Sequence, residues 1–183
     1  MQQAPFPVVG APNGMALGGG CEVLLHCDAI QAGAETYMGL VESGVGVIPG
    51  WGGCARYLER RQAASETKGG PMPGVKDTFL ALAMPQFSVS ASAQDAMKKH
   101  WLRPGDGLTM NSDYLLSDAK AKALKMTENY TPPESPVFTL PGKSGKKGLL
   151  MGVDSFYIKG DATHHDVVVI DALADVLTGG DTH

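Results

Sequence analysis

The residues with the clearest chemical potential are two glutamates, Glu22 and Glu42, which lie twenty positions apart. Glu22 comes directly after the run Gly18-Gly19-Gly20-Cys21, and Glu42 comes after Met38-Gly39-Leu40-Val41. A pair of carboxylates can act as general base and general acid, provided that their surroundings give them different proton affinities. The spacing therefore indicates acid–base chemistry on a carbonyl compound.

The glycines before Glu22 predict a loop that turns into a helix. The first turn of a helix has N–H groups without intrahelical acceptors, and the helix dipole favours negative charge there. Glycine lets a ligand oxygen approach the backbone closely because it has no Cβ. We therefore expect Gly18, Gly19 and Gly20 to offer an N–H group to an oxyanion on a thioester or a similar carbonyl. Losing one such donor costs roughly 3–4 kcal/mol of barrier.

The two glutamates are expected to differ in their surroundings. Glu22 would lie about one turn into the helix, where the dipole favours the ionised form that a base needs. Glu42 follows an apolar run, and a partly dry setting would raise its pKa and suit it to act as an acid.

Each of these features also has a structural explanation when taken alone. Gly18–Gly20 would allow a helix and a strand to pack tightly, Glu22 would be an ordinary first-turn glutamate, and Glu42 would be a surface residue of a loop. The joint occurrence of all three favours a catalytic site.

Two long blocks of the sequence resemble the crotonase (enoyl-CoA hydratase/isomerase) superfamily. They are the segments 7–22 and 37–53, and a weaker similarity continues through Ser90–Ala96. The resemblance implies that Gly19 supplies one N–H of the oxyanion hole. It also implies that Glu22 activates the water that adds at the β-carbon, while Glu42 protonates the α-carbon.

The same resemblance implies further contacts with substrate. Gly18 and Gly20 flank the oxyanion donor, and Gly50 matches a glycine that lines the site near the attacking water. Trp51 either lines an acyl pocket or serves only in packing. No metal ligand is expected.

The resemblance implies an α/β fold, a crotonase-like ββα spiral fragment with a helical C-terminal part. Residues 1–112 would form a hydratase domain that lacks its N-terminal half, and residues 113–183 a helical region with a Pro/Gly/Lys linker at 131–147. The chain resembles the C-terminal region of bacterial multifunctional proteins that carry a 3-hydroxyacyl-CoA dehydrogenase. It looks like a piece cut from such a protein.

The function expected from this resemblance is hydration of 2-enoyl-CoA to 3-hydroxyacyl-CoA in fatty-acid β-oxidation. One alternative is a catalytically incomplete fragment that acts as an oligomerisation or interaction module. Another keeps the superfamily and changes the chemistry to an enoyl-CoA isomerase or an acyl-CoA thioesterase.

Composition limits the partners. The 183 residues carry a formal charge of −4, which provides no basic surface of the kind that nucleic acid requires. No apolar run approaches the ~20 residues of a membrane span. The expected partners are an acyl-CoA substrate and further copies of the chain. No cofactor is expected here, and NAD would bind only to a fused dehydrogenase domain elsewhere.

The three cysteines indicate the compartment. The number of cysteines is odd, and no two of them form a Cys-x-x-Cys motif; they are Cys21, Cys27 and Cys54. A reducing compartment therefore fits best. We expect a cytoplasmic protein, or a mitochondrial matrix protein in a eukaryote.

Local patterns predict the order of the elements. Strands are expected at 7–11 and 29–32, with an irregular segment at 36–48. The expected helices are 19–27, 52–61, 76–83, 91–99, 113–129, 149–158 and 165–177. Ser90 or Ser92 would cap the fourth of these, and Ser112 or Asp113 the fifth.

For two polar clusters a structural interpretation is favoured over a functional one. The pair His164-His165 is compatible with a metal site, but Thr163 and Asp166 around it favour the start of a helix. Lys143, Lys146 and Lys147 would either meet a phosphate or form a solvated loop, which we consider the better interpretation.

Overall fold

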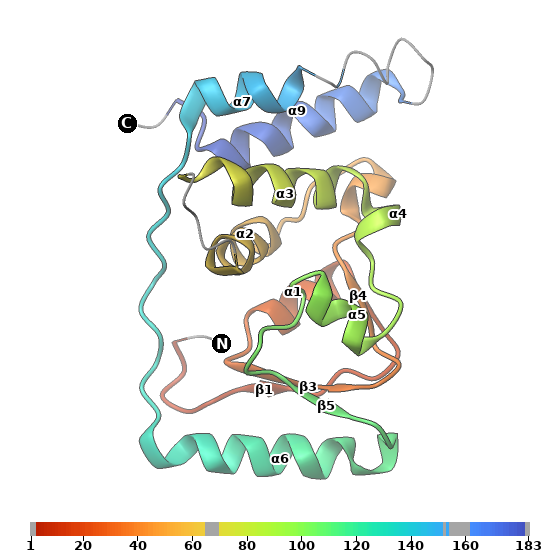
Figure 1. The fold of residues 1–183 in the computed structure, drawn as a ribbon, viewed down its shortest axis with the longest axis vertical. Helices are drawn as coiled ribbons and strands as arrows, with labels where there is room; N and C mark the ends of the chain where they lie inside the picture. Colours follow the sequence, from red (N-terminus) through yellow and green to blue (C-terminus); the bar gives the residue numbers. More distant parts are fainter. Residues whose placement is uncertain (1–2, 65–69, 152, 154–161, 182–183) are drawn as a thin grey trace. The chain divides into compact units, whose positions relative to one another are not determined.

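The computed structural model describes residues 3–64, 70–151, 153 and 162–181, and it divides into two compact units (Figure 1). Unit 1 combines residues 1–40 with 89–136, and unit 2 combines residues 41–88 with 137–183. Each unit joins two separate stretches of the chain, so neither follows the boundary expected between residues 112 and 113. The division into a hydratase domain and a helical C-terminal region at residues 112 and 113 stays a prediction.

Unit 1 contains two parallel sheets. One has the order β1 (Val9–Gly10), β3 (Ala29–Gly33), β5 (Gly107–Thr109), and the other pairs β2 (Met15–Leu17) with β4 (Tyr37–Gly39). The chain runs through β1, β2 and helix α1 (Gly19–Leu25), and then returns through β3 and β4. Because β1 pairs with β3 and β2 with β4, each strand lies beside its counterpart in the next turn of a ββα spiral. The expected fold class is confirmed.

The sheet of β1, β3 and β5 lies between helices (Figure 1). All five residues of β3 are buried, as expected for a strand covered on both faces, and its one polar side chain, Gln31, donates a hydrogen bond to the Thr109 hydroxyl at 2.8 Å. Helix α6 (Leu115–Met126) packs along β1 and β3, with Leu115 and Ala119 as its buried residues. Helix α1 contacts β2, and helix α5 (Ala93–Lys98) contacts β4.

The helix expected at 113–129 starts differently, and only one of its sides faces the sheet. It is a series of η2 (Ser112–Tyr114), α6 and η3 (Thr127–Asn129). The capping side chain is that of Asn111, which accepts the Asp113 N–H at 3.0 Å, and not that of Ser112 or Asp113. Leu116 and Leu124 are exposed, because only one side of α6 meets the sheet.

Unit 2 is helical. It contains η1 (Glu42–Val45), α2 (Gly53–Ala64), α3 (Met72–Ala83), α4 (Pro85–Ser88), α7 (Gly142–Leu150) and α9 (His164–Thr178). Helix α3 is its centre, since it contacts each of the other five. The core of this unit includes the fully buried side chains of Tyr57, Val75, Leu173 and Leu177.

Three expectations about local structure are corrected. The segment 36–48 is not irregular throughout, because it contains β4 and η1; strand β2 was not foreseen at all. The linker expected at 131–147 is shorter, because α7 already begins at Gly142. The helix expected at 149–158 begins too late, since α7 ends at Leu150, and most of its remaining residues lie outside the described part of the chain.

Among the described helices, none combines the length and apolar character that a membrane crossing requires.

Candidate functional site

Helix α1 begins at the glycine run, as the sequence predicts. Gly18 is the N-terminal flanking residue, and its φ of 55° and ψ of −129° lie where a Cβ is disfavoured. The Gly18 N–H donates to the carbonyl oxygen of Gly39 in β4 at 2.9 Å. Gly18 therefore cannot offer this N–H to a ligand; its part is to turn the chain from β2 into α1.

Gly19 and Gly20 form the open first turn of α1. Both are exposed, and a Cβ added to either would meet no atom within 4 Å. Tight packing of helix against strand therefore does not explain these glycines. The Gly19 N–H makes no hydrogen bond within the described part of the chain, as expected for the first helical residue. It is a donor that an outside acceptor can reach.

Glu22 lies in the first turn of the same helix, but it is not a solvated surface residue. It is only 3% exposed, and Cys21, Leu24 and Leu25 of α1 are buried as well. A buried carboxylate is costly unless hydrogen bonds or an opposite charge compensate for its lost hydration. Glu22 is thus a first-turn glutamate, as the structural alternative holds, but a buried one.

Glu42 is the first residue of η1 in unit 2 and is half-buried. Helices α3, α4 and α9 all contact η1. The Ser43 hydroxyl donates to the carbonyl oxygen of Leu82 at 2.5 Å, which ties η1 to α3. The turn ends at Gly46, whose φ of 81° is left-handed. Glu42 thus stands on an anchored turn and not on a loose surface loop.

His165 contributes a second anchor that sequence reasoning missed. Its Nε2 lies 2.8 Å from the Gly46 carbonyl oxygen, and a Cβ at Gly46 would come within 3.0 Å of the imidazole ring. The two residues are 119 positions apart, so no local pattern connects them. The contact explains why a side chain at residue 46 would be disfavoured in addition to the positive φ.

The capping interpretation of the segment around His164 and His165 is confirmed. Thr163 and Asp166 form a reciprocal capping box at the start of α9. Hydrogen bonds from the Thr163 N–H and hydroxyl hold the pKa of Asp166 below its usual value. In the described part of the chain no group of three or more His, Cys, Asp or Glu side chains could hold a metal ion.

Gly50 and Trp51 precede α2 in unit 2. Both are exposed, Trp51 to 75%, and a Cβ at Gly50 would meet nothing within 4 Å. The Trp51 ring is therefore not part of the apolar core. Its role toward an acyl group stays a prediction, as does that of Gly50 near the attacking water.

An apolar cavity of about 430 Å³ lies within unit 2. Ser43 and Gly44, directly after Glu42, form part of its wall. Most of the remaining wall comes from apolar side chains of α3, α4 and α9, among them Phe79, Leu80, Phe87, Val169 and Ile170. Its chemistry suits a hydrocarbon portion of a ligand.

Two of the three lysines at 143–147 are paired with carboxylates. Lys146 Nζ lies 2.8 Å from Asp175 and 2.9 Å from Asp171, and the hydrogen bonds that it donates to these carboxylates raise the pKa of Lys146. Lys143 lies 2.9 Å from Asp181. The expectation of a solvated loop is wrong, because all three lysines lie on helix α7. The carboxylates paired with Lys143 and Lys146 do not favour a phosphate site.

The sequence-predicted residues are thus divided between the units. Unit 1 brings Gly18, Gly19, Gly20 and Glu22 together at one helix start. Unit 2 carries the other three, Glu42, Gly50 and Trp51.

Comparisons with known proteins agree with the motifs. Residues 1–68 match the family model described as enoyl-CoA hydratase/isomerase. A "Probable 3-hydroxyacyl-CoA dehydrogenase" of Bacillus subtilis (strain 168) is 41% identical over 176 residues, which are 95% of this chain and 22% of that protein. A "Fatty acid oxidation complex subunit alpha" of Idiomarina loihiensis is 50% identical over 56 residues, 31% of this chain and 8% of that protein.

Solved structures agree in fold. The crystal structure of an enoyl-CoA hydratase from Bacillus anthracis has a TM-score of 0.54 and 22% identity, and the match covers 96% of this chain and 55% of that one. The chain thus spans about half the length of this hydratase and about a fifth of the Bacillus subtilis relative. The fold is that of the crotonase-type enoyl-CoA hydratases, and residues 1–68 belong to the enoyl-CoA hydratase/isomerase family.

Proposed function

We propose that this chain contributes to the hydration of a 2-enoyl-CoA thioester to a 3-hydroxyacyl-CoA. The observation that carries the proposal is the start of α1, where an accessible Gly19 N–H and the buried carboxylate of Glu22 occupy one helical turn. A thioester oxygen that gains negative charge needs such a donor, and the water that attacks needs such a base.

The steps assign one role to each group. Glu22 accepts a proton from water as the water oxygen bonds to the β-carbon of the enoyl group. The resulting negative charge on the thioester oxygen is stabilised by the Gly19 N–H. Glu42 then gives a proton to the α-carbon. Water has been added across the double bond, and no oxidant or metal is consumed.

The acyl-CoA thioester is the substrate, and we propose no further cofactor for this chain. The apolar cavity of unit 2, whose wall includes the two residues after Glu42, is of a kind that takes a hydrocarbon group. NAD would act at a dehydrogenase domain of a longer protein, in keeping with the name of the Bacillus subtilis relative. Calorimetry that detected NAD binding to this chain would contradict that division.

We further propose that the complete protein works in fatty-acid oxidation. The support is the set of relatives named as fatty acid oxidation complex proteins, together with the similarity to the Bacillus subtilis protein over nearly all of this chain. In such a protein the 3-hydroxyacyl product would be the substrate of the dehydrogenase.

The direct test is loss of the conjugated enoyl-thioester absorbance when the purified chain meets crotonyl-CoA. We expect turnover that falls about 10²–10⁴-fold in Glu22→Gln and in Glu42→Gln, the usual range for removing a positioned acid or base. Both variants keep the size of the side chain, so the circular dichroism and the melting temperature should stay close to those of the parent.

Other outcomes separate the competing functions. Conversion of a 3-enoyl thioester with dependence on Glu42 alone would favour an isomerase. Release of free thiol would favour a thioesterase. No reaction from a correctly folded chain would reject hydration by this chain and favour the interaction module.

A further inference from the structure

We propose that Ser90 is a positioning residue for the oxyanion donor of Gly19. It would act through a chain of hydrogen bonds, here called the relay, that runs from Ser90 to Met38 and from Gly39 to Gly18. The relay would hold the start of α1 in place. The inference rests on the function proposed above. It adds a residue that lies outside the segments 7–22 and 37–53, which contain the two glutamates. All the groups involved belong to unit 1.

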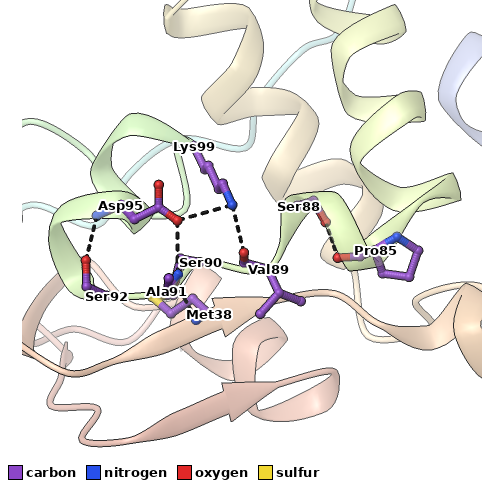
Figure 2. A network of polar contacts seen from close by, with 9 residues as sticks. All are labelled: Met38, Pro85, Ser88, Val89, Ser90, Ala91, Ser92, Asp95 and Lys99. Carbon is purple, nitrogen blue, oxygen red and sulfur yellow. Dashed lines mark hydrogen bonds and ion pairs between the residues drawn. The ribbon is translucent and has the colours of Figure 1, made fainter.

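The relay begins where Ser90 pairs with Met38 in β4 (Figure 2). The Met38 N–H donates to the Ser90 hydroxyl oxygen at 2.8 Å, and the Ser90 N–H donates to the Met38 carbonyl oxygen, also at 2.8 Å. Ser90 is 1% exposed and Met38 is fully buried, so water does not compete for these groups. Two short bonds to one residue hold β4 in position.

The next step passes from β4 to the start of the helix. Gly39 follows Met38 directly, and its carbonyl oxygen accepts the Gly18 N–H at 2.9 Å. Gly39 also packs closely against Val89, because a Cβ added to Gly39 would come within 2.8 Å of Val89 Cγ2. The position of the Gly39 carbonyl therefore fixes Gly18, and Gly18 fixes the direction of the Gly19 N–H.

The segment that carries Ser90 is itself fixed by α5 (Figure 2). Lys99 Nζ donates to the Val89 carbonyl oxygen at 2.8 Å, and the Ala91 N–H donates to Asp95 Oδ2 at 3.0 Å. Lys99 also pairs with Asp95 at 3.1 Å. The residues before and after Ser90 are thus hydrogen-bonded to α5 and to Lys99, the residue directly after it. These bonds restrict any movement of Ser90 relative to α5.

This arrangement matters because catalytic electrostatics depend on donors that are already in place. A displacement of the reacting groups by about 1 Å can cost as much as 10²-fold in rate. Loss of the Ser90 hydroxyl leaves the Met38 N–H buried without its acceptor, and β4 would shift or loosen to satisfy it. We expect the Gly19 N–H to lose its alignment as a result, while Glu22 keeps its place further along α1.

The test compares Ser90→Ala with Thr36→Val in the complete chain. Thr36 is the matched control, because it is equally buried in unit 1 and its hydroxyl donates to the carbonyl oxygen of Pro12, off the path from β4 to Gly18. Lys99→Met is a second relay variant at a partly exposed side chain, so it remains informative if Ser90→Ala does not fold.

Two measurements do not depend on turnover. The first is hydrogen exchange by NMR, in which the Gly18 amide should exchange about tenfold faster in Ser90→Ala, while amides of α6 stay unchanged. The second is the absorbance shift of a bound 4-dialkylaminocinnamoyl thioester, whose carbonyl is polarised by an oxyanion donor. This shift should shrink in Ser90→Ala and Lys99→Met and persist in Thr36→Val. Hydration should show kcat lowered about tenfold with KM within about twofold, since the lost interaction belongs to the transition state.

The outcomes separate this inference from the proposed function. A parent chain that hydrates crotonyl-CoA while Ser90→Ala keeps its kcat, its probe shift and its Gly18 exchange would overturn the relay alone. A parent that polarises the probe but does not hydrate would overturn the function alone. Equal acceleration of exchange across all of unit 1 would reduce Ser90 to a general stabilising role and would also overturn the relay.

Discussion

At the scale of single residues, the start of α1 separates three glycines that look alike in the sequence. Gly18 gives its N–H to Gly39 and has a positive φ, whereas Gly19 and Gly20 lie open to solvent. Only the last two have N–H groups that no strand has already taken. Of these, the resemblance assigns the oxyanion to Gly19, and the difference between neighbouring positions makes that assignment testable.

We predict that Gly19→Ala lowers hydration by at least about tenfold without loss of stability. The added methyl has room within the protein, and alanine is favoured over glycine in a helix by about 1 kcal/mol. A thioester oxygen, however, would have to approach the N–H past the new Cβ. Steady-state kinetics and urea unfolding measure the two effects.

Gly148→Ala, in helix α7 of unit 2, is the matched control for that experiment. Its Cβ also meets nothing within 4 Å, so its effect on folding should be the same. Equal activity of the two variants would mean that the Gly19 N–H is not the donor.

At the scale of elements, the helices of unit 2 position Glu42 by fixing both ends of a short turn. Ser43 ties the start of η1 to α3, and His165 at the start of α9 contacts Gly46 at its end. The capping box of α9 therefore affects more than the local helix, because fraying of the first turn would release His165.

We predict that the stability contributed by this capping box depends on pH. The pKa of Asp166 is lowered in the folded chain, so its contribution is complete above the unfolded value of about 3.9 and is lost as the pH falls through the folded value. At neutral pH, Asp166→Asn should cost about 1 kcal/mol, the usual value of a helix cap. Urea unfolding of parent and variant should show this difference shrinking below about pH 4.

Thr163→Ser serves as the control at the other side of the box. It retains the hydroxyl that donates to Asp166 and should unfold close to the parent at every pH. A gap between parent and Asp166→Asn that stayed constant down to pH 2 would contradict the proposed ionic origin.

At the scale of the whole molecule, the two glutamates belong to different compact units, and each unit is built from two separate stretches of chain. Unit 2 also exposes large apolar side chains near its candidate residues. Those close together in sequence are Val45, Val47 and Trp51, which are 79%, 54% and 75% exposed. Apolar surface of this kind is characteristic of contact sites between proteins.

We predict that the isolated chain self-associates. Light scattering after size exclusion should give a mass above that of the 19.2 kDa monomer, and the mass should rise with concentration. Val45→Lys and Trp51→Lys should shift the population toward the monomer, because a charge at a dry contact costs free energy. A monomer at every concentration tested would refute the prediction.

The sequence by itself determined what short-range chemistry dictates. The glycine run predicted the start of α1, and Thr163 with Asp166 predicted the start of α9, because helix caps depend on residues within one turn of each other. The short segment 29–32 was also correctly predicted as a strand, β3. The two motif blocks predicted the fold class through a family resemblance.

Only the tertiary structure decided which groups at these positions are available. Contacts between residues far apart in the chain decide three features of the site. The Gly18 N–H is bonded to Gly39, Glu22 is buried, and Gly46 contacts His165. The strands β2 and β4 escaped prediction because three-residue segments have too little periodicity to identify, and their stability comes from pairing with each other. Local propensity cannot encode such pairing, because each partner is defined by a fold that brings distant segments together.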